Sequence, residues 1–196
     1  GGRPETLVLR DFIAAFITFR EEVITRRTKF ELAKARDRAH ILLGLVIAVT
    51  KAITDLERIG DEATKIARQA IAMNKDGLSP RGYIEVRHIG GHVSRMLQDA
   101  LDAFARLDMQ LALTVVQTDK QVDMEYSTAM RELVTFMIED PRSITRVLNI
   151  MWSLRALERI GDHARNLAQY VIYLVNGEDV RHANLENITE IVNAKV

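Results

Sequence analysis

Leu56-Glu-Arg-Ile-Gly-Asp61 and Leu157-Glu-Arg-Ile-Gly-Asp162 are the same hexapeptide, and they lie 101 residues apart. The likeness extends further, since eight of the twelve positions that begin at Leu56 and at Leu157 are identical. Self-similarity at a fixed offset indicates two copies of one structural unit. In each copy a glutamate and an aspartate stand at positions i and i+4, so a helix presents both carboxylates on one face, about one turn apart.

The composition of the chain predicts an all-α protein. Its 196 residues include only three prolines, and 47% are hydrophobic, which is enough for a core. With no cysteine, disulfides and thiolate metal sites are excluded. A net charge of zero makes nucleic acid an unlikely partner. The lack of cysteine fits a cytoplasmic location. No uninterrupted apolar run long enough to span a bilayer and no signal peptide are expected.

In the first part of the chain, apolar spacing predicts two helices. The first is expected from Leu7 to about Arg26, and the second starts at a capping box formed by Thr28 and Glu31. A single helix from Leu7 to Asn74 is the alternative. A cluster of breaker residues at 74–82 ends this region.

Further helices are expected at about 83–106, 109–139 and 141–176, with a short one from about Leu185. Asp108 and Asp140 are the expected N-caps, and Gly177 is the expected residue after the last long helix. Trp152 and most methionines are expected in the core. The predicted parts are residues 1–76, an antiparallel three-helix bundle at 83–177 and a tail at 178–196.

A third acidic pair, Asp119 and Asp123, follows the same i and i+4 spacing. Antiparallel packing would bring it beside Glu158 and Asp162, so that four carboxylates share one patch. Their repulsion would be relieved by a hard cation such as Fe, Mn, Mg or Ca, because these ions bind oxygen ligands. A solvated acidic face is the alternative explanation for each pair.

Other chemical groups give weaker signals. His88 and His92 have the spacing of a metal clip, but placement on the surface or in the core is the favoured interpretation, and His163 is a weak metal candidate. The sequence has no glycine-rich phosphate loop and no Ser/His/Asp grouping. A catalytic role is therefore not expected.

From about residue 50 to its end, the chain resembles the PhoU family of phosphate-uptake regulators. The resemblance rests on residues 55–61, 96–104, 119–123 and 158–162. It implies two tandem three-helix bundles, a cytoplasmic location, and restraint of phosphate import and of its two-component signalling. It also implies that E(D)xxxD motifs bind metal in pairs, which here means Asp119 and Asp123 with Glu158 and Asp162.

The first 49 residues suggest a different origin. Residues 9–16, 20–32 and 34–42 resemble helices of the A subunit of bacterial DNA gyrase that lead into its coiled-coil arm. The catalytic tyrosine region is not covered, so no topoisomerase activity is implied. The join at 48–51 lies inside a helix without a linker, which indicates an engineered chimera. Glu57 and Asp61 would then form only half a metal site.

The leading hypothesis is therefore a non-catalytic chimera of helical fragments that retains a metal-binding patch. Its expected fold is an elongated, all-α structure of two stacked antiparallel bundles, the first rebuilt from gyrase-like helices. The alternative is a PhoU-like negative regulator that binds the phosphate transporter and a sensor kinase. A DNA-contacting module, based on the basic residues at 26–27 and 36–38, is disfavoured by the weak charge. Exposed apolar surface on the replaced half is expected to favour a homodimer.

Overall fold

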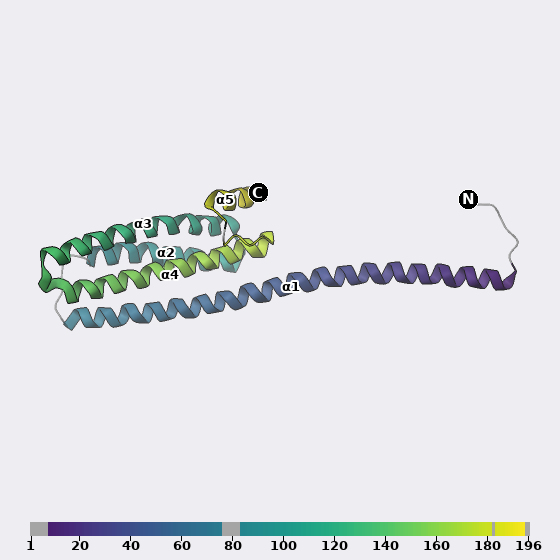
Figure 1. The fold of residues 1–196 in the computed structure, drawn as a ribbon, viewed down its shortest axis with the longest axis horizontal. Helices are drawn as coiled ribbons and strands as arrows, with labels where there is room; N and C mark the ends of the chain where they lie inside the picture. The colour runs from purple at the N-terminus through teal and green to yellow at the C-terminus, as the bar shows by residue number, and fades with distance from the viewer. Residues whose placement is uncertain (1–7, 76–82, 182, 195–196) are drawn as a thin grey trace. The chain divides into compact units, whose positions relative to one another are not determined.

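The computed structural model describes residues 8–75, 83–181 and 183–194, and all regular elements in these ranges are helices. In chain order they are α1 (Leu9–Lys75), α2 (Tyr83–Arg106), α3 (Met109–Glu139), the 3-10 turn η1 (Pro141–Ser143), α4 (Ile144–Asn176) and α5 (Leu185–Asn193) (Figure 1). The all-α prediction is confirmed. The predicted breaker lies largely outside the described residues.

The predicted break between two helices near Arg26 is wrong, because α1 continues through this region. Glu31 does not cap Thr28. Its carboxylate lies 2.9 Å from Arg27 Nε, and Arg26 pairs in the same way with Glu22 at 2.7 Å. Oppositely charged side chains four residues apart stabilise a continuous helix, so the apparent capping box is an interior segment.

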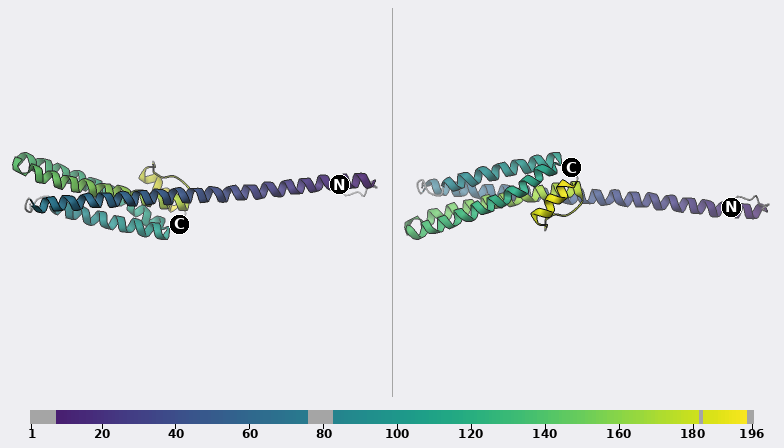
Figure 2. Two further views of the ribbon diagram at one scale, coloured as in Figure 1. Left: turned by 90° about the horizontal axis from the view of Figure 1, so that it is seen from below. Right: turned by 90° about the horizontal axis from the view of Figure 1, so that it is seen from above.

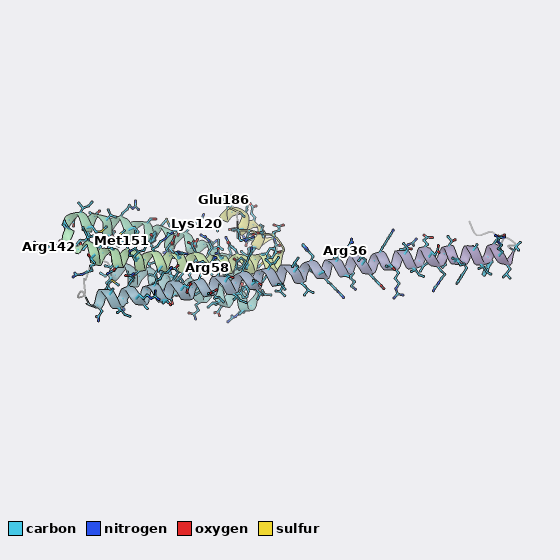
Figure 3. All side chains as sticks on the ribbon, turned by 60° about the horizontal axis from the view of Figure 1, so that its bottom comes forward. Arg36, Arg58, Lys120, Arg142, Met151 and Glu186 are labelled. Carbon is cyan, nitrogen blue, oxygen red and sulfur yellow. The ribbon has the colours of Figure 1, made fainter. Side chains whose placement is uncertain are left out.

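The chain divides into two units, residues 1–46 and residues 47–196. In the described part of the first unit, residues 9–46 are all helical, and side chains project all round the helix near Arg36 (Figure 3). Its large apolar side chains are exposed, including Phe12, Phe16 and Phe30. By length and composition α1 is also apolar enough to cross a membrane, a test that core helices of soluble proteins pass as well. Because the test admits charged residues within the apolar window, the expectation that no uninterrupted apolar run spans a bilayer stays a prediction.

The second unit is built around α2, α3 and α4, which pack against one another (Figures 1 and 2). α5 packs on α3. Fully buried side chains fill the space between them, among them Val93, Met96, Val122, Leu154 and Leu167. The predicted helices at 83–106 and 109–139 have the observed bounds, and the third begins with the turn η1 before α4.

The ends of these helices follow the predicted signals. Asp108 accepts hydrogen bonds from the backbone N–H groups of Gln110 and Leu111, both at 3.0 Å. Asp140 accepts one from Arg142 N at 3.1 Å and precedes Pro141. Gly177 ends α4 with a φ of 83°, in the left-handed region that glycine adopts without strain.

The part of α1 in the second unit buries one face. Residues 48, 52, 55, 59, 62 and 66 alternate steps of four and three, and all are buried or half-buried. This is the spacing of a helix that packs along one seam. Residues 57 and 61 fall outside the seam and are exposed.

The prediction that Trp152 lies in the core is wrong, since its side chain is 62% exposed. Ile150 and Leu154, two residues away on either side, are buried, and a step of two residues turns a helix by about 200°. Trp152 therefore faces away from the bundle. The methionine prediction holds for Met96 but not for Met124, which is 64% exposed.

Candidate metal centre and buried polar network

Four carboxylates face one another across the seam between α3 and α4. Asp119 and Asp123 come from α3, and Glu158 and Asp162 come from α4. Asp119 is buried and only 4% exposed. Charge repulsion links all four, because Asp162 and Asp123 both raise the pKa of Glu158, and Asp162 also raises the pKa of Asp119 and of Asp123.

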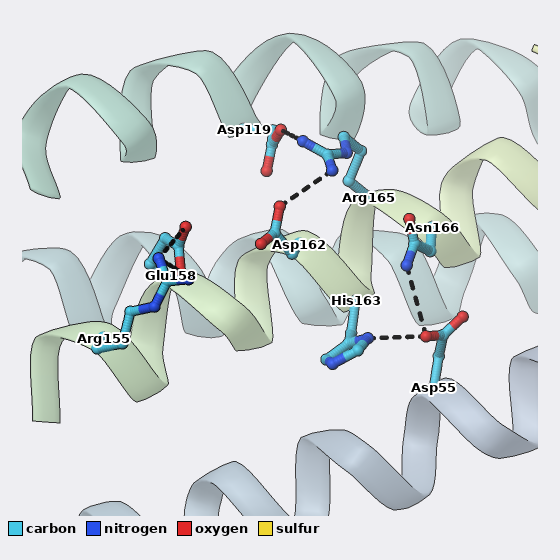
Figure 4. A network of polar contacts seen from close by, with 8 residues as sticks. All are labelled: Asp55, Asp119, Arg155, Glu158, Asp162, His163, Arg165 and Asn166. Carbon is cyan, nitrogen blue, oxygen red and sulfur yellow. Dashed lines mark hydrogen bonds and ion pairs between the residues drawn. The ribbon is translucent and has the colours of Figure 1, made fainter. Parts of the chain in front are cut away.

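Arginine side chains enter this carboxylate patch. The Arg165 guanidinium lies between Asp119 and Asp162, with Nη1 at 2.5 Å from Asp119 Oδ2 and Nη2 at 3.0 Å from Asp162 Oδ1 (Figure 4). Arg155 pairs with Glu158 at 2.9 Å. These ion pairs place cationic groups where the carboxylates are most crowded.

The arginines do not fully offset the negative charge. Burial raises the pKa of Asp119, Asp123 and Glu158 above the usual carboxyl range, and repulsion by neighbouring carboxylates raises it further. The Arg165 charge lowers the pKa of Asp119 but does not cancel the rise. Additional positive charge at this patch would therefore stabilise the fold.

The carboxylate oxygens of this patch are the kind of ligand that hard cations prefer, because Mg, Ca, Mn and Fe ions bind oxygen. Among the described residues, no three of these carboxylates bring ligand atoms within 4.8 Å of one another. The Arg165 guanidinium provides the positive charge at the patch in this conformation. A cation there would have to draw the carboxylates closer and displace Arg165.

Asp119 and Asp123 also line a cavity of 520 Å³ between α3, α4 and α5. Three cationic side chains share this cavity with them, namely Lys120, Arg165 and Arg181. The patch is thus reached from an open space of mixed charge, which gives a small ion a route to the carboxylates.

The first copy of the repeat is arranged differently, because Glu57 and Asp61 are both exposed on α1. Neither lies beside the carboxylates of α3 and α4. The buried acids of this segment are instead Asp55, 3% exposed, and Glu62, also 3% exposed. The structure therefore places the acidic pair of the first motif on a solvated face and buries the acidic residues that flank the motif.

Asp55 is the centre of a buried polar network between α1 and α4. Its carboxylate lies 2.7 Å from His163 Nδ1 and accepts a hydrogen bond from Asn166 Nδ2 at 3.4 Å (Figure 4). It also accepts a hydrogen bond from Tyr170 Oη at 2.9 Å. A carboxylate accepts only, so His163 Nδ1 carries the proton in this pair. Burial and the bond to Asp55 raise the pKa of Tyr170 to about 12.

Glu62 makes the second polar link between the same helices. It pairs with Arg159 of α4 at 3.1 Å and with Lys65 at 2.9 Å. Arg159 is thus an ion-pair partner within the bundle. The sequence interpretation missed Asp55 and Glu62 as network centres. The signal that identifies them is the seam spacing, which places both acids at positions where apolar residues are expected.

The glycines of the two copies have different surroundings. A methyl group added at Gly60 would meet nothing within 4 Å, while at Gly161 it would lie 3.8 Å from Val122 and 3.9 Å from Met96. Both distances at Gly161 are ordinary van der Waals contacts. Neither glycine is therefore required by a close approach of the described atoms.

A family model and individual relatives with known names all match this chain to the same family. The family model described as "PhoU domain" matches residues 9–70 and 86–171. The chain is 65% identical over 150 residues to the phosphate-specific transport system accessory protein PhoU homolog of Pseudomonas aeruginosa, covering 76% of this chain and 62% of that protein. For the PhoU accessory protein of Escherichia coli the identity is 39% over 153 residues, covering 78% and 63%. The chain thus spans about three fifths of these relatives' length.

Comparison with solved structures leads to the same family. The crystal structure of PhoU from Pseudomonas aeruginosa matches with a TM-score of 0.69 at 65% identity, over 70% of this chain and 66% of that one. The phosphate transport system regulatory protein PhoU from Streptococcus pneumoniae matches with a TM-score of 0.64 at 28% identity, over 71% and 66%.

These matches overturn the predicted chimera. The family model begins at residue 9 and runs without interruption to residue 70, so it crosses the predicted join at 48–51. The helix is also continuous there. The assignment of residues 3–49 to a gyrase-like segment, the engineered origin and the rebuilt first bundle were wrong. Short helical motifs rich in Arg, Glu and Phe are shared by unrelated helices, which explains the misassignment.

Proposed function

We propose that this chain, which belongs to the PhoU family, is a cytoplasmic accessory protein of a phosphate-specific transport system and restrains phosphate uptake. The observation that carries the proposal is the 65% identity over 150 residues to the Pseudomonas aeruginosa accessory protein. The match to a second regulatory protein at a TM-score of 0.64 supports it. The role is one of binding and regulation, without catalysis.

Two partners follow from this role. The first is the phosphate transporter, and the second is the sensor kinase of the associated two-component system. The test is copurification of the tagged chain with each partner from membranes of phosphate-replete bacteria. Recovery of the transporter supports the proposal, and a chain that retains neither partner while the Pseudomonas aeruginosa relative retains them contradicts it.

The carboxylate patch on α3 and α4 has the role of a cation site in this proposal. Asp119, Asp123, Glu158 and Asp162 would hold a hard ion such as Mn or Mg. The raised pKa values of Asp119, Asp123 and Glu158 support such a role, because a bound cation relieves the repulsion between the carboxylates. A bound ion supplies positive charge and crosslinks the two helices. Arg165 keeps the patch partly neutral in the absence of the ion.

Calorimetry with Mn²⁺ tests this role by comparing two matched variants. Asp162 and Asp61 occupy the same position in the two repeat copies. Asp162→Asn is expected to weaken binding at least tenfold, by about 1.4 kcal/mol or more, because it removes a ligand from the patch. Asp61→Asn is expected to leave binding unchanged, since Asp61 is exposed and apart from the patch. Equal binding by both variants would sink the assignment.

A further inference from the structure

A second group of metal-ligand side chains lies between α2 and α3. His88 and His92 stand four residues apart on α2, and Glu125 faces them from α3. His92 Nδ1 lies 2.8 Å from Glu125 Oε2, and His88 Nε2 lies 3.7 Å from Glu125 Oε1. One ligand atom from each of the three residues falls within 4.8 Å of the other two. From this geometry we infer that His88, His92 and Glu125 form a binding site for Zn²⁺.

The chemistry of these side chains favours zinc over the hard cations of the carboxylate patch. Two imidazole nitrogens and one carboxylate oxygen, with a position left for water, make a common zinc ligand set. A tetrahedral site with bonds of 2.0–2.1 Å needs ligand atoms about 3.3 Å apart. Ligand atoms that already lie within 4.8 Å reach this spacing by small side-chain rotations. The His rings, 4.5 Å apart and inclined at 57°, are not stacked.

Neighbouring groups support the three ligands. Gln121 Nε2 donates a hydrogen bond to Glu125 Oε1 at 2.9 Å, so the carboxylate is held in place from outside the site. Such outer contacts orient metal ligands and raise affinity. His92 and Glu125 are mostly buried, with side chains 19% and 21% exposed, whereas His88 is 60% exposed. The site is therefore anchored on two enclosed ligands and open to solvent on the side of His88.

An unpartnered buried oxygen adds an independent observation. Glu85 lies one turn before His88 on α2, and its Oε2 atom is buried without a hydrogen-bond partner among the described residues. Glu85, His88 and Glu125 line one cavity of 310 Å³. A buried acceptor without a partner is costly, and a cation in this cavity would provide one. Glu85 is not one of the three residues whose ligand atoms lie together, so its role in this site is to accept a hydrogen bond from zinc-bound water.

The site is separate from the proposed function and from the four carboxylates of α3 and α4. Its ligands come from a different seam, and none of them belongs to an acidic pair of the repeat. The competing explanation is an ordinary hydrogen bond from His92 to Glu125 that joins α2 to α3. That explanation requires neither His88 nor the open cavity, and the experiment below separates the two.

The test is a calorimetric Zn²⁺ titration of the whole chain after chelator treatment. Wild-type protein is expected to bind one Zn²⁺ at this site. His88→Ala is expected to weaken binding at least tenfold, because loss of an outer contact alone costs about 10–100-fold. His88 is exposed, so its removal leaves the fold intact, as circular dichroism would confirm. Gln121→Ala is expected to weaken binding by about 10–100-fold.

Two control variants separate this site from others. His40→Ala removes an exposed histidine of α1, and Asp162→Asn alters the carboxylate patch. Both are expected to keep the His88-dependent Zn²⁺ binding. The strong visible absorption of four-coordinate Co²⁺, a probe of the tetrahedral geometry that zinc sites adopt, is expected in these controls and absent in His88→Ala. No Zn²⁺ binding by the wild type, or His88→Ala binding Zn²⁺ as tightly as the wild type, would overturn the inference.

Discussion

Among single residues, Asp55 carries the largest structural role that sequence reasoning missed. It is 3% exposed and bonds to three side chains of α4, at positions 163, 166 and 170. The motif drew attention to Glu57 and Asp61, which are exposed. The identity of a residue in a repeat does not reveal which face of its helix is covered, and that face depends on packing partners distant in sequence.

Asp55→Asn is expected to destabilise the fold by about 1–3 kcal/mol, because the three donors then compete for one amide oxygen and buried groups lose partners. Chemical denaturation measures the change. Asp61→Asn is the matched control on the same helix, and it is expected to change the free energy of unfolding by less than about 0.5 kcal/mol. Equal effects of the two substitutions would show that Asp55 does not anchor the seam.

Gly60→Ala is expected to stabilise the protein by about 0.5–1 kcal/mol. The position is in the middle of α1, and an added methyl group meets no described atom within 4 Å. Alanine loses less conformational freedom on folding than glycine does. Thermal unfolding gives the measurement. A lower melting temperature would indicate that a neighbour, such as a partner protein or a second copy, approaches Gly60 closely.

Among the elements, helix ends were the most predictable feature. Asp108, Asp140, Gly177 and Asn184 stand at the ends where their conformational preferences place them. These helix ends depend on the residues next to them in the chain, so the sequence alone is enough to predict them. The Thr28 capping box failed because α1 continues through this segment, and Glu31 pairs with Arg27 one turn away. A cap signal inside a region of continuous helical spacing is ambiguous for this reason.

The cap of α3 provides a prediction on local chemistry. Asp108 accepts hydrogen bonds from two backbone N–H groups at the helix start. Asp108→Ala is expected to lower the free energy of unfolding by about 1 kcal/mol. Asp108→Asn, which keeps an acceptor oxygen, is expected to recover most of the loss. Denaturant titration of both variants checks this, and identical losses would mean that the cap contributes through charge alone.

The seam between α3 and α4 predicts a pH dependence. Because burial and mutual repulsion raise the pKa of Asp119, Asp123 and Glu158 in the fold, the folded chain binds more protons than the unfolded one. Stability contributed by these groups therefore falls as pH rises from the ordinary carboxyl range near 3.8 to 4.5 through the raised values. Above these raised pKa values all three carboxylates are ionised, and their full destabilising effect on the fold is present.

The substitution Asp123→Asn tests whether stability falls with rising pH as these pKa shifts predict. At pH 7 the variant is expected to be slightly more stable than the wild type, by a few tenths of a kcal/mol. The gain is small because Asp123 is only partly desolvated and solvent at its exposed side screens its charge. The difference is expected to shrink as pH falls toward 4. Asp61→Asn is the control with no such trend. A stability difference for Asp123→Asn that grows at low pH would contradict the proposed repulsion.

At the scale of the whole molecule, the two units differ in what stabilises them. Residues 47–196 share a packed core, whereas all described residues from 8 to 46 except Gly44 are exposed. The first 46 residues misled the sequence interpretation because they were judged by short local likenesses. A family match over residues 9–70 required comparison with whole sequences. The fold class and the helices at 83–106 and 109–139 followed from periodicity, which is a local property.

Hydrogen exchange tests this difference between units. Amides of residues 9–46 are expected to exchange far faster than those of buried positions such as 96, 122 and 154, because an isolated helix has little stability beyond its own hydrogen bonds. Mass spectrometry of peptides resolves the two sets. Protection of residues 9–46 equal to that of the core would show that a second copy or a partner covers the apolar surface.

The central claim is that this chain acts in phosphate regulation as its PhoU relatives' names indicate. The most direct measurement uses a bacterium that lacks its own PhoU and carries a reporter of the phosphate-starvation response, grown with excess phosphate. The Pseudomonas aeruginosa relative is the positive control. If the proposal is right, expression of this chain returns the reporter to the repressed level. A reporter that stays as high as with an empty vector, while the control represses it and the chain is present and folded, would contradict the proposal.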